Sequence, residues 1–269
     1  MTEAPRYLSS AEASALAGVA PSTVKRWADE GLLPCVRTAG GHRRFLQVDV
    51  ERLVSQLREP SRPLAEGDGW LGPLLHPDPH ALIGHLYTTR ARLGTWHAAA
   101  DALGGGLREL GEAWASGRIL VLEEHAASER VRRALAQVCS SVPVSAAAPQ
   151  CLLATAAEDD HGLGLCLAEL TLREAGWRAM WAGPRSPLNE LVDVVQAGAV
   201  RMVGLSASEH TRANNKAVRL QAEKLAQVCR LRRIPLVLGG SGWWPEGVEG
   251  SHRLHDLGAF HTLVRDVSL

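Results

Sequence analysis

The spacing of apolar and polar residues divides the chain into three parts, with a polar stretch after the first. Residues 1–58 contain short amphipathic segments and are predicted to form a compact, helix-rich module. Residues 59–69 (EPSRPLAEGDG) combine Pro, Gly and charged residues, which is typical of a linker. Over residues 70–142, apolar residues recur every three or four positions, as in WHAAADALGGGLRELGEAWASG, and this spacing predicts a small helical bundle.

The pattern changes at residue 150, where short apolar runs begin to alternate with amphipathic stretches. The runs are CLLATA, WRAMWAG, RMVGLSAS, IPLVLGG and a late one at AFHTLV, so five strands are expected. Strands that alternate with helices predict βα units and a parallel sheet. The fold class is therefore α + α/β, and residues 150–269 are predicted to form a doubly wound, Rossmann-like domain that binds ligands at the carboxyl ends of its strands.

Charge, apolar content and cysteine usage narrow the range of functions. The 269 residues include 29 Lys and Arg and 29 Asp and Glu, so any surface for nucleic acid must be local. No apolar run reaches the roughly 18 residues of a membrane span, and the N-terminus lacks the features of a signal peptide. The five cysteines are scattered without a CxxC pair, which suits buried thiols in a reducing compartment. We therefore expect a cytoplasmic protein without a membrane partner.

The first module has the pattern of a DNA-binding head. YLSSAEASALAGVAPSTVKRWADEGLLP predicts a helix, a tight turn at Gly18 and a second helix, with Ser9 or Ser10 capping the first and Ser22 the second. A short helix that begins with polar residues fits the major groove of DNA. The side chains it would present to phosphates or base edges are Ser22, Thr23, Lys25 and Arg26.

A hairpin follows this second helix. CVRTAGGHRRF places Gly40 and Gly41 at the tip, and the turn brings His42, Arg43 and Arg44 toward the DNA backbone or minor groove. Residues 22–45 hold five Lys and Arg against two acidic residues, a small local excess of positive charge. The alternative is a solvated three-helix module that binds a protein.

STVKRWADEGLLP followed by RTAGGHRRF resembles the winged helix-turn-helix of MerR-type and excisionase-like regulators. The resemblance covers about 50 residues and implies a double-stranded DNA operator as the partner. MerR-type regulators commonly continue into a long coiled-coil helix that forms their dimer. This chain has one short helix and a linker, so the contacts of a dimer or tetramer are expected elsewhere.

Three short motifs fall at predicted strand ends in the α/β domain. Asp159, His161 and Gly164 form D-x-H-x-x-G just past the first strand, Ser206 ends the third, and Gly239–Gly240 end the fourth. Carboxyl ends of parallel strands share one edge of a sheet, so the three motifs are expected to form one pocket. A histidine in such a loop is, taken alone, more often a surface residue than a metal ligand.

Together the motifs resemble the cobalamin-binding pattern D-x-H-x-x-G, S-x-L and G-G, with Ser208 in place of the Leu. The resemblance implies that His161 ligates cobalt from the lower face, while Asp159 accepts its other ring N–H. It also implies that Gly164, Gly239 and Gly240 leave room for the nucleotide tail and that Ser206 hydrogen-bonds it. The substitution at Ser208 is expected to weaken an apolar contact without affecting the ligand.

The helical bundle contains Trp114, nine further residues, and then Glu124–His125. This W-x9-E-H spacing resembles the cap of the CarH/LitR family of light-responsive, adenosylcobalamin-dependent repressors. By that resemblance, Trp114 packs against the upper 5′-deoxyadenosyl group, and Glu124 and His125 line the same space. Ala115 stands where the best-understood members carry a His that takes the cobalt's upper face after light. Without the resemblance, Trp114 would be a core residue beside a solvated helix start.

The predicted function is a regulator and not an enzyme: adenosylcobalamin stabilises an oligomer in the dark, and light releases it from DNA. The alternatives are a light-independent cobalamin sensor and a corrinoid-carrying methyltransferase-type subunit, against which the DNA-binding head argues. Trp243 and Trp244 are assigned either to the nucleotide tail or to a subunit contact. The remaining histidines show no metal-ligand spacing and are expected at caps, turns or the surface: His76, His80, His85, His97, His252, His255 and His261.

Overall fold

The computed structural model describes residues 6–17, 21–29, 33–38, 40–58 and 69–267, and of Ser22, Thr23 and Arg26 it describes the backbone only. The chain forms two compact units, Met1–Leu64 and Ala65–Leu269, and each is described by itself. Of residues 55–58, too, only the backbone is described. The linker predicted at 59–69 lies, apart from Gly69, outside the described residues, and so does the turn predicted at Gly18. None of the described helices combines the length and apolar content needed to span a membrane.

The first unit is a small helical module with a three-stranded sheet in the order β1-β3-β2. Its elements are β1 (Tyr7–Leu8), α1 (Ser10–Ala17), α2 (Pro21–Asp29), β2 (Val36–Arg37), β3 (Arg43–Leu46) and α3 (Gln47–Arg58). Ser9 caps α1, since its hydroxyl accepts from the Glu12 N–H while its own N–H donates to the Glu12 carboxylate. The predicted cap at Ser22 is wrong: α2 begins at Pro21, which takes the first helical position and places Ser22 inside the helix.

The second unit begins with the helical bundle, which contains α4 (Leu71–Leu75), α5 (Pro79–Leu93), α6 (Trp96–Ala115) and α7 (Val121–Ser141). Asp78 caps α5 by accepting from the His80 N–H at 2.9 Å, and Pro79 occupies the first turn. Leucine, alanine and valine side chains from all four helices form one core, which continues into Cys166, Leu167 and Leu170 of the next helix. The bundle therefore shares its core with the α/β region.

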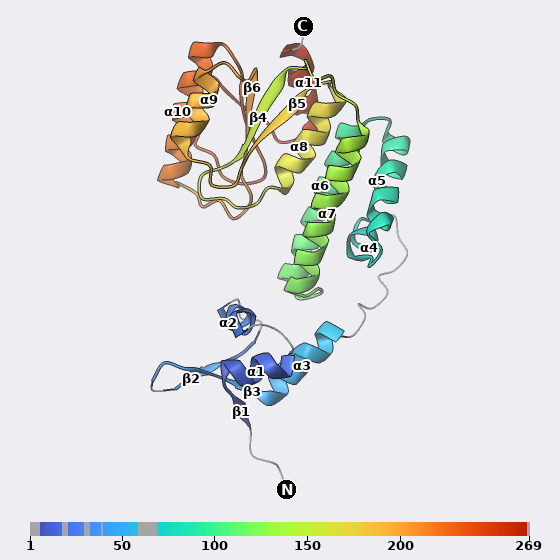
Figure 1. The fold of residues 1–269 in the computed structure, drawn as a ribbon, viewed down its shortest axis with the longest axis vertical. Helices are drawn as coiled ribbons and strands as arrows, with labels where there is room; N and C mark the ends of the chain where they lie inside the picture. Colours follow the sequence, from blue (N-terminus) through green and yellow to red (C-terminus); the bar gives the residue numbers. More distant parts are fainter. Residues whose placement is uncertain (1–5, 18–20, 30–32, 39, 59–68, 268–269) are drawn as a thin grey trace. The chain divides into compact units, whose positions relative to one another are not determined.

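The α/β region contains a five-stranded parallel sheet in the order β5-β4-β6-β7-β8. Along the chain its elements are β4 (Gln150–Thr155), α8 (Leu163–Glu174), β5 (Arg178–Gly183), α9 (Leu188–Gln196), β6 (Met202–Ser206), α10 (Lys216–Arg232), β7 (Leu236–Gly239), β8 (Ser251–Arg253) and α11 (Leu257–Val267). Side chains of α9 and α10 fill one face, and those of α8 and α11 fill the other. This doubly wound arrangement confirms the predicted fold class (Figure 1).

The fifth strand does not lie where the sequence pattern put it. AFHTLV belongs to α11, and the edge strand is the three-residue β8 instead. The apolar residues Phe260 and Val264 are four positions apart and both buried, so a helical spacing inside the run decided its structure. A strand as short as β8 carries too few residues to show a strand pattern.

One carboxylate joins the cap helix to the last helix. Asp101 of α6 accepts hydrogen bonds from the N–H groups of Leu257 and Gly258, at 2.9 and 3.3 Å. These are two of the N–H groups that α11 itself cannot satisfy, and a negative charge there also suits the helix dipole. The bundle and the C-terminal helix are thereby held together.

Candidate ligand site and candidate nucleic-acid interface

Asp159 is the anchor of the loop that follows β4. Its side chain is only 2% exposed, and it accepts from the Ser208 N–H at 2.6 Å and the Thr211 hydroxyl at 2.9 Å. The His161 N–H is a further donor at 2.9 Å. Burial opposes ionisation, but the hydrogen bonds from Ser208, His161 and Thr211 outweigh it and lower the pKa of Asp159 to about 2. The carboxylate is therefore ionised at neutral pH.

The His161 ring contacts the Asp159 carboxylate and remains exposed to solvent. Its Nδ1 lies 2.9 Å from the Asp159 carboxylate, while its side chain is 55% exposed. With Nδ1 donating to the carboxylate, Nε2 carries the lone pair, and no described residue hydrogen-bonds to it. The pair therefore presents Nε2 of the imidazole to whatever binds at this edge of the sheet.

Two residues that sequence reasoning missed complete the loop. The His210 ring stacks on His161 at a centroid distance of 4.4 Å and an angle of 8°, and Thr211 holds Asp159. A cavity of about 300 Å³ opens here, lined by Ala157, Glu158, Asp159, Asp160, His161, His210, Thr211, Arg212 and Asn215. The position of His210 just past a predicted strand end was the available signal.

Ser208 does more than replace an apolar residue. Its backbone N–H binds one Asp159 oxygen, and its hydroxyl lies 3.1 Å from the other and 3.3 Å from Nδ1 of His161. The expectation that the substitution weakens an apolar contact alone is therefore incomplete. The serine adds a polar contact to both members of the Asp–His pair.

The three sequence motifs lie on neighbouring strands. Thr155 at the end of β4 pairs with Ser206, and Ser206 pairs with Gly239 on β7. A Cβ on Gly164 would lie 2.6 Å from the Ser206 hydroxyl, and a Cβ on Gly240 would lie 2.1 Å from the Ala207 carbonyl oxygen. The glycines are thus required by close backbone and side-chain approach at this edge, as well as by the positive φ of Gly240.

Trp244 and Arg253 hold the glycine turn after β7. Trp244 is buried in the core, and its indole N–H donates to the Gly239 carbonyl at 2.8 Å. The Arg253 guanidinium donates to the carbonyls of Leu238 and Gly240, at 3.0 and 2.8 Å. Trp243 lies against the Arg219 guanidinium at 5.8 Å. These contacts give Trp244 a structural role that neither of the two sequence-based assignments included.

The cap residues lie where α6 ends and α7 begins. Trp114 is in the last turn of α6 and 38% exposed, so it is not a fully buried core residue. Glu124 accepts from the Ser128 hydroxyl at 2.6 Å, and the His125 ring lies 3.7 Å from the same carboxyl group. In Figure 1, α6 and α7 extend past the sheet on the side where α8 begins, which is the side of the strand carboxyl ends.

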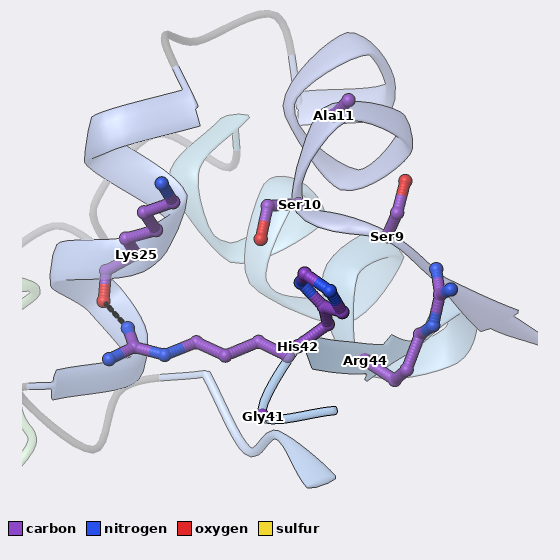
Figure 2. Close-up of a pocket in the computed structure, with 8 residues that line it drawn as sticks. Ser9, Ser10, Ala11, Lys25, Gly41, His42 and Arg44 are labelled. Carbon is purple, nitrogen blue, oxygen red and sulfur yellow. Dashed lines mark hydrogen bonds between the residues drawn. The ribbon is translucent and has the colours of Figure 1, made fainter. Parts of the chain in front are cut away.

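The first unit has a groove of about 690 Å³. It is lined by Ser9, Ser10, Ala11, Lys25, Gly41, His42, Arg43 and Arg44. Figure 2 shows the His42 ring and the Arg44 side chain both pointing toward Ser9 and Ser10 at the start of α1. The groove therefore gathers cationic groups beside hydroxyl groups, a combination that suits phosphate oxygens.

The three basic-capable residues of the hairpin have different surroundings. Arg43 donates to the Lys25 carbonyl at 2.6 Å and forms an ion pair with Asp29, so it ties β3 to α2. Its hydrogen bond to Asp29 raises the pKa of Arg43. His42 and Arg44 carry no such bond within the described residues. Of the predicted DNA contacts on the hairpin, Arg43 is therefore committed to the fold, whereas His42 and Arg44 face the groove.

Known proteins match two parts of the chain. Residues 9–45 match the family described as MerR family regulatory protein, and residues 97–138, which span most of α6 and α7, match the B12 binding domain. The HTH-type transcriptional repressor CarH of Myxococcus xanthus is 28% identical, over 72% of this chain and 76% of its own length. Both the regulatory match and the named relative agree with the prediction that the chain is not an enzyme.

A solved structure shares the fold of the second unit. The monomethylamine corrinoid protein of Methanosarcina barkeri superposes with a TM-score of 0.53 at 13% identity, covering 72% of this chain and 94% of that one. This likeness is one of fold. The order of the matched segments, a MerR regulatory match followed by a B12 binding match, makes the chain similar to CarH in its organisation.

Proposed function

We propose that this CarH-like regulator binds adenosylcobalamin at His161, holds operator DNA as an oligomer in the dark, and releases it in light. The observation that carries the proposal is the Asp159–His161 pair, in which a buried carboxylate holds Nδ1 and leaves Nε2 open. This is the arrangement that a histidine needs to ligate a metal through one nitrogen. Its position at the strand carboxyl ends, beside a helical bundle, supports a ligand held between the two.

Further features of the site suit a ligand with a long polar tail. The Thr155 hydroxyl is buried at the end of β4 and has no partner within the described residues. It pairs in register with Ser206, whose hydroxyl lies beside the bare Cα of Gly164. We infer that Thr155 and Ser206 receive hydrogen bonds from the nucleotide tail, and that Gly164, Gly239 and Gly240 leave its path clear.

The cap supplies the light response in this proposal. When bound, adenosylcobalamin provides a cobalt–carbon bond that light can break. Trp114, with Glu124 and His125 beside it, would pack against the deoxyadenosyl group, so loss of that group would remove a packing partner from the end of α6. A helix end that loses its partner can shift, and such a shift would alter the contacts between protomers.

Oligomerisation explains how so small a head can hold DNA. One helix-turn-helix unit makes few contacts, whereas linking two or four heads raises the overall affinity by a factor on the order of 10²–10⁴. Dissociation of a dimer or tetramer therefore suffices for release. In this proposal Ser22, Thr23, Lys25 and Arg26 are the contacts of α2 with the major groove of DNA, and His42 and Arg44 contact phosphates.

The experiment is an absorption spectrum of the protein mixed with adenosylcobalamin, before and after green light, with gel filtration and operator gel shifts on the same samples. We expect a bound corrinoid, a larger species in the dark, and loss of both the large species and DNA binding after light. A protein that stays colourless at saturating adenosylcobalamin contradicts the proposal. If light leaves both the size of the species and its DNA binding unchanged, only the light response is contradicted, and cobalamin binding stands.

The DNA contacts can be tested with one matched pair. Arg44→Ala should weaken operator binding and lower the slope of log affinity against log salt by about 1, because one phosphate contact is lost. Arg43→Ala should also lower the melting temperature, because Arg43 ties the hairpin to α2. Equal salt slopes for Arg44→Ala and the unmodified protein would argue against a phosphate contact.

Ala115 favours a second candidate, a cobalamin-sensing regulator that does not respond to light. The residue after Trp114 offers no nitrogen to replace the lost upper ligand, so the light state lacks that stabilising bond. Under this candidate, DNA binding depends on cobalamin but is the same in dark and light. A corrinoid-carrying subunit would instead transfer a methyl group to a free thiol and would not need the head.

A further inference from the structure

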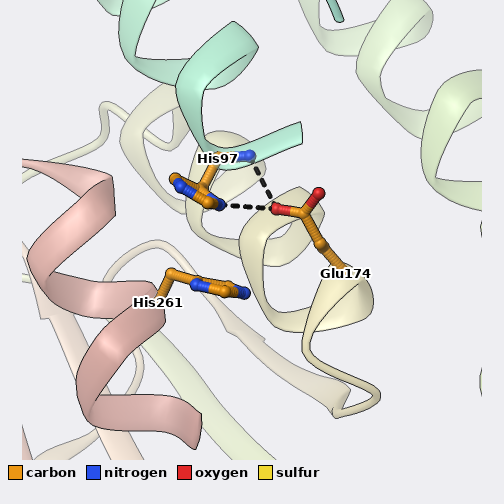
Figure 3. A group of neighbouring side chains, drawn as sticks. All are labelled: His97, Glu174 and His261. Carbon is orange, nitrogen blue, oxygen red and sulfur yellow. Dashed lines mark hydrogen bonds and ion pairs between the residues drawn. The ribbon is translucent and has the colours of Figure 1, made fainter. Parts of the chain in front are cut away.

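A second group of titratable side chains lies far from the corrinoid site in the fold. His97 is in the first turn of α6, Glu174 is the last residue of α8, and His261 is in the middle of α11. Figure 3 shows the two imidazole rings facing one another with the carboxylate at their edge. His261, which was expected at the surface, is partly buried here.

The three side chains are close enough to share one ion. One ligand atom from each lies within 4.8 Å of the others. Nδ1 of His97 is 2.7 Å from the Glu174 carboxylate, and the two rings stack at a centroid distance of 4.2 Å and an angle of 19°. Around a zinc ion, bonds of about 2.0–2.2 Å place neighbouring ligand atoms roughly 3.3 Å apart. Closing the site would require side-chain rotations that bring these atoms closer and turn the two stacked rings so that one nitrogen of each points at the ion.

The donor set has the chemistry of a transition-metal site. Two imidazoles and one carboxylate suit zinc and similar divalent ions, and three protein ligands leave a fourth position for water. The side chains of His97 and Glu174 are 21% and 16% exposed, so an ion can reach them from solvent.

Glu174 already has a structural role, and the two roles are compatible. Its carboxylate accepts from the backbone N–H groups of Trp96 and His97, which are among the unsatisfied donors at the start of α6. An ionised carboxylate has about four acceptor positions, so these bonds persist when one lone pair turns to a metal. Only the hydrogen bond between the carboxylate and Nδ1 of His97 is replaced.

We infer that His97, Glu174 and His261 bind one divalent transition-metal ion of the zinc class, which ties α6, α8 and α11 together. The ligands are separated by 76 and 86 intervening residues, so the ion would cross-link segments that are distant in the chain. The site is separate from His161, because α8 stands between the two. Metal and corrinoid are therefore expected to bind independently.

The test is a zinc titration of the full-length protein against a chromophoric chelator, with no corrinoid present. The unmodified protein should hold one zinc ion that His161→Ala leaves in place. His97→Ala and His261→Ala should each weaken it by more than about 100-fold, since even residues that only orient a ligand contribute about 10–100-fold. His252→Ala and His255→Ala, at exposed histidines, are the matched controls and should change nothing.

Zinc should also raise the melting temperature by roughly 5–10 °C at about 100 times its dissociation constant, and His261→Ala should abolish this shift. If a variant does not fold, the unmodified protein provides the test instead. The imidazole ¹⁵N resonances of its His97 and His261 should move together at one equivalent of zinc. A protein that binds no zinc at micromolar concentration overturns the proposal. The proposal is also overturned if zinc shifts only the resonances of His161 and His210, or if zinc binding persists when both His97 and His261 are replaced.

Discussion

A histidine–carboxylate pair lies at each end of α8, and the two pairs are built differently. Before the first turn, Asp159 and His161 come from one loop, with the acid buried and the ring open to solvent. At the last residue, Glu174 meets His97 from another helix, and both side chains are mostly covered. The first arrangement presents a ring nitrogen to an incoming group, whereas the second joins helices. The same two chemical groups thus can bind a ligand where the imidazole is exposed, and hold helices together where both groups are covered.

The largest difference between the two pairs is expected when the histidine of each is replaced and adenosylcobalamin affinity is measured. His161→Ala should weaken adenosylcobalamin binding by more than about 100-fold, because it removes the direct ligand rather than a group that orients one. His97→Ala should leave that affinity within about threefold, since α8 has 12 residues and places the two ends roughly 18 Å apart. Equilibrium dialysis of both variants checks this. Equal losses would erase the distinction between the two ends.

The glycine turn after β7 can be compared with a second glycine at positive φ. Gly240→Ala should cost about 3 kcal/mol of unfolding free energy, because it adds a Cβ 2.1 Å from a carbonyl oxygen at a φ of +83°. Gly247 has a similar φ of +70° but open space around it, so Gly247→Ala should cost only about 1 kcal/mol. Urea unfolding measures both. Similar costs would mean that the close approach at Gly240 is readily relieved.

Asp159 and Glu174 should contribute differently to the pH dependence of stability. A pKa of about 2 for Asp159, against an ordinary 3.8, stabilises the folded state above pH 3.8, and this contribution is lost as the pH falls through 2. Asp159→Asn should therefore cost about 2 kcal/mol at pH 7 and flatten the fall in stability below pH 4. Burial opposes ionisation of Glu174, but the N–H groups of Trp96 and His97 still lower its pKa, and Glu174→Gln should have a smaller effect. Urea midpoints from pH 7 to pH 2 provide the comparison.

Ser208→Leu should give the smallest change. The leucine restores the residue that the cobalamin motif usually has, and the backbone N–H still binds Asp159. The hydroxyl contacts with Asp159 and His161 are lost, and one such hydrogen bond contributes about 1 kcal/mol. Adenosylcobalamin affinity should therefore change by less than about tenfold, as measured by the same dialysis. A larger loss would make the serine hydroxyl an essential part of the site.

The sequence predicted the features that depend on neighbouring residues. D-x-H-x-x-G placed Asp159 and His161 together because only one residue lies between them, and alternating apolar runs predicted the parallel sheet. Gly240 was noted for the room it leaves, and its contact with Ala207 has that same local origin. The fold class followed from these local patterns.

The features that sequence reasoning missed depend on distant contacts. His97 and His261 meet only because α6 and α11 pack on α8, and no spacing along the chain shows this. Arg43 was assigned to DNA because its neighbours are basic, but its binding to Asp29 across the unit decides its surroundings. AFHTLV was assigned as a strand because a six-residue apolar run fits either structure until its partners are known.

The bond between Asp101 and the start of α11 bears on the order in which the second unit folds. The carboxylate lies 156 positions before Leu257, so the contact forms only once segments distant in the chain have come together. Contacts between distant residues are slow to form, because the entropy of closing the intervening loop must be met before they add stability. The start of α11 is therefore expected to dock on α6 after the local helical turns of the bundle have formed.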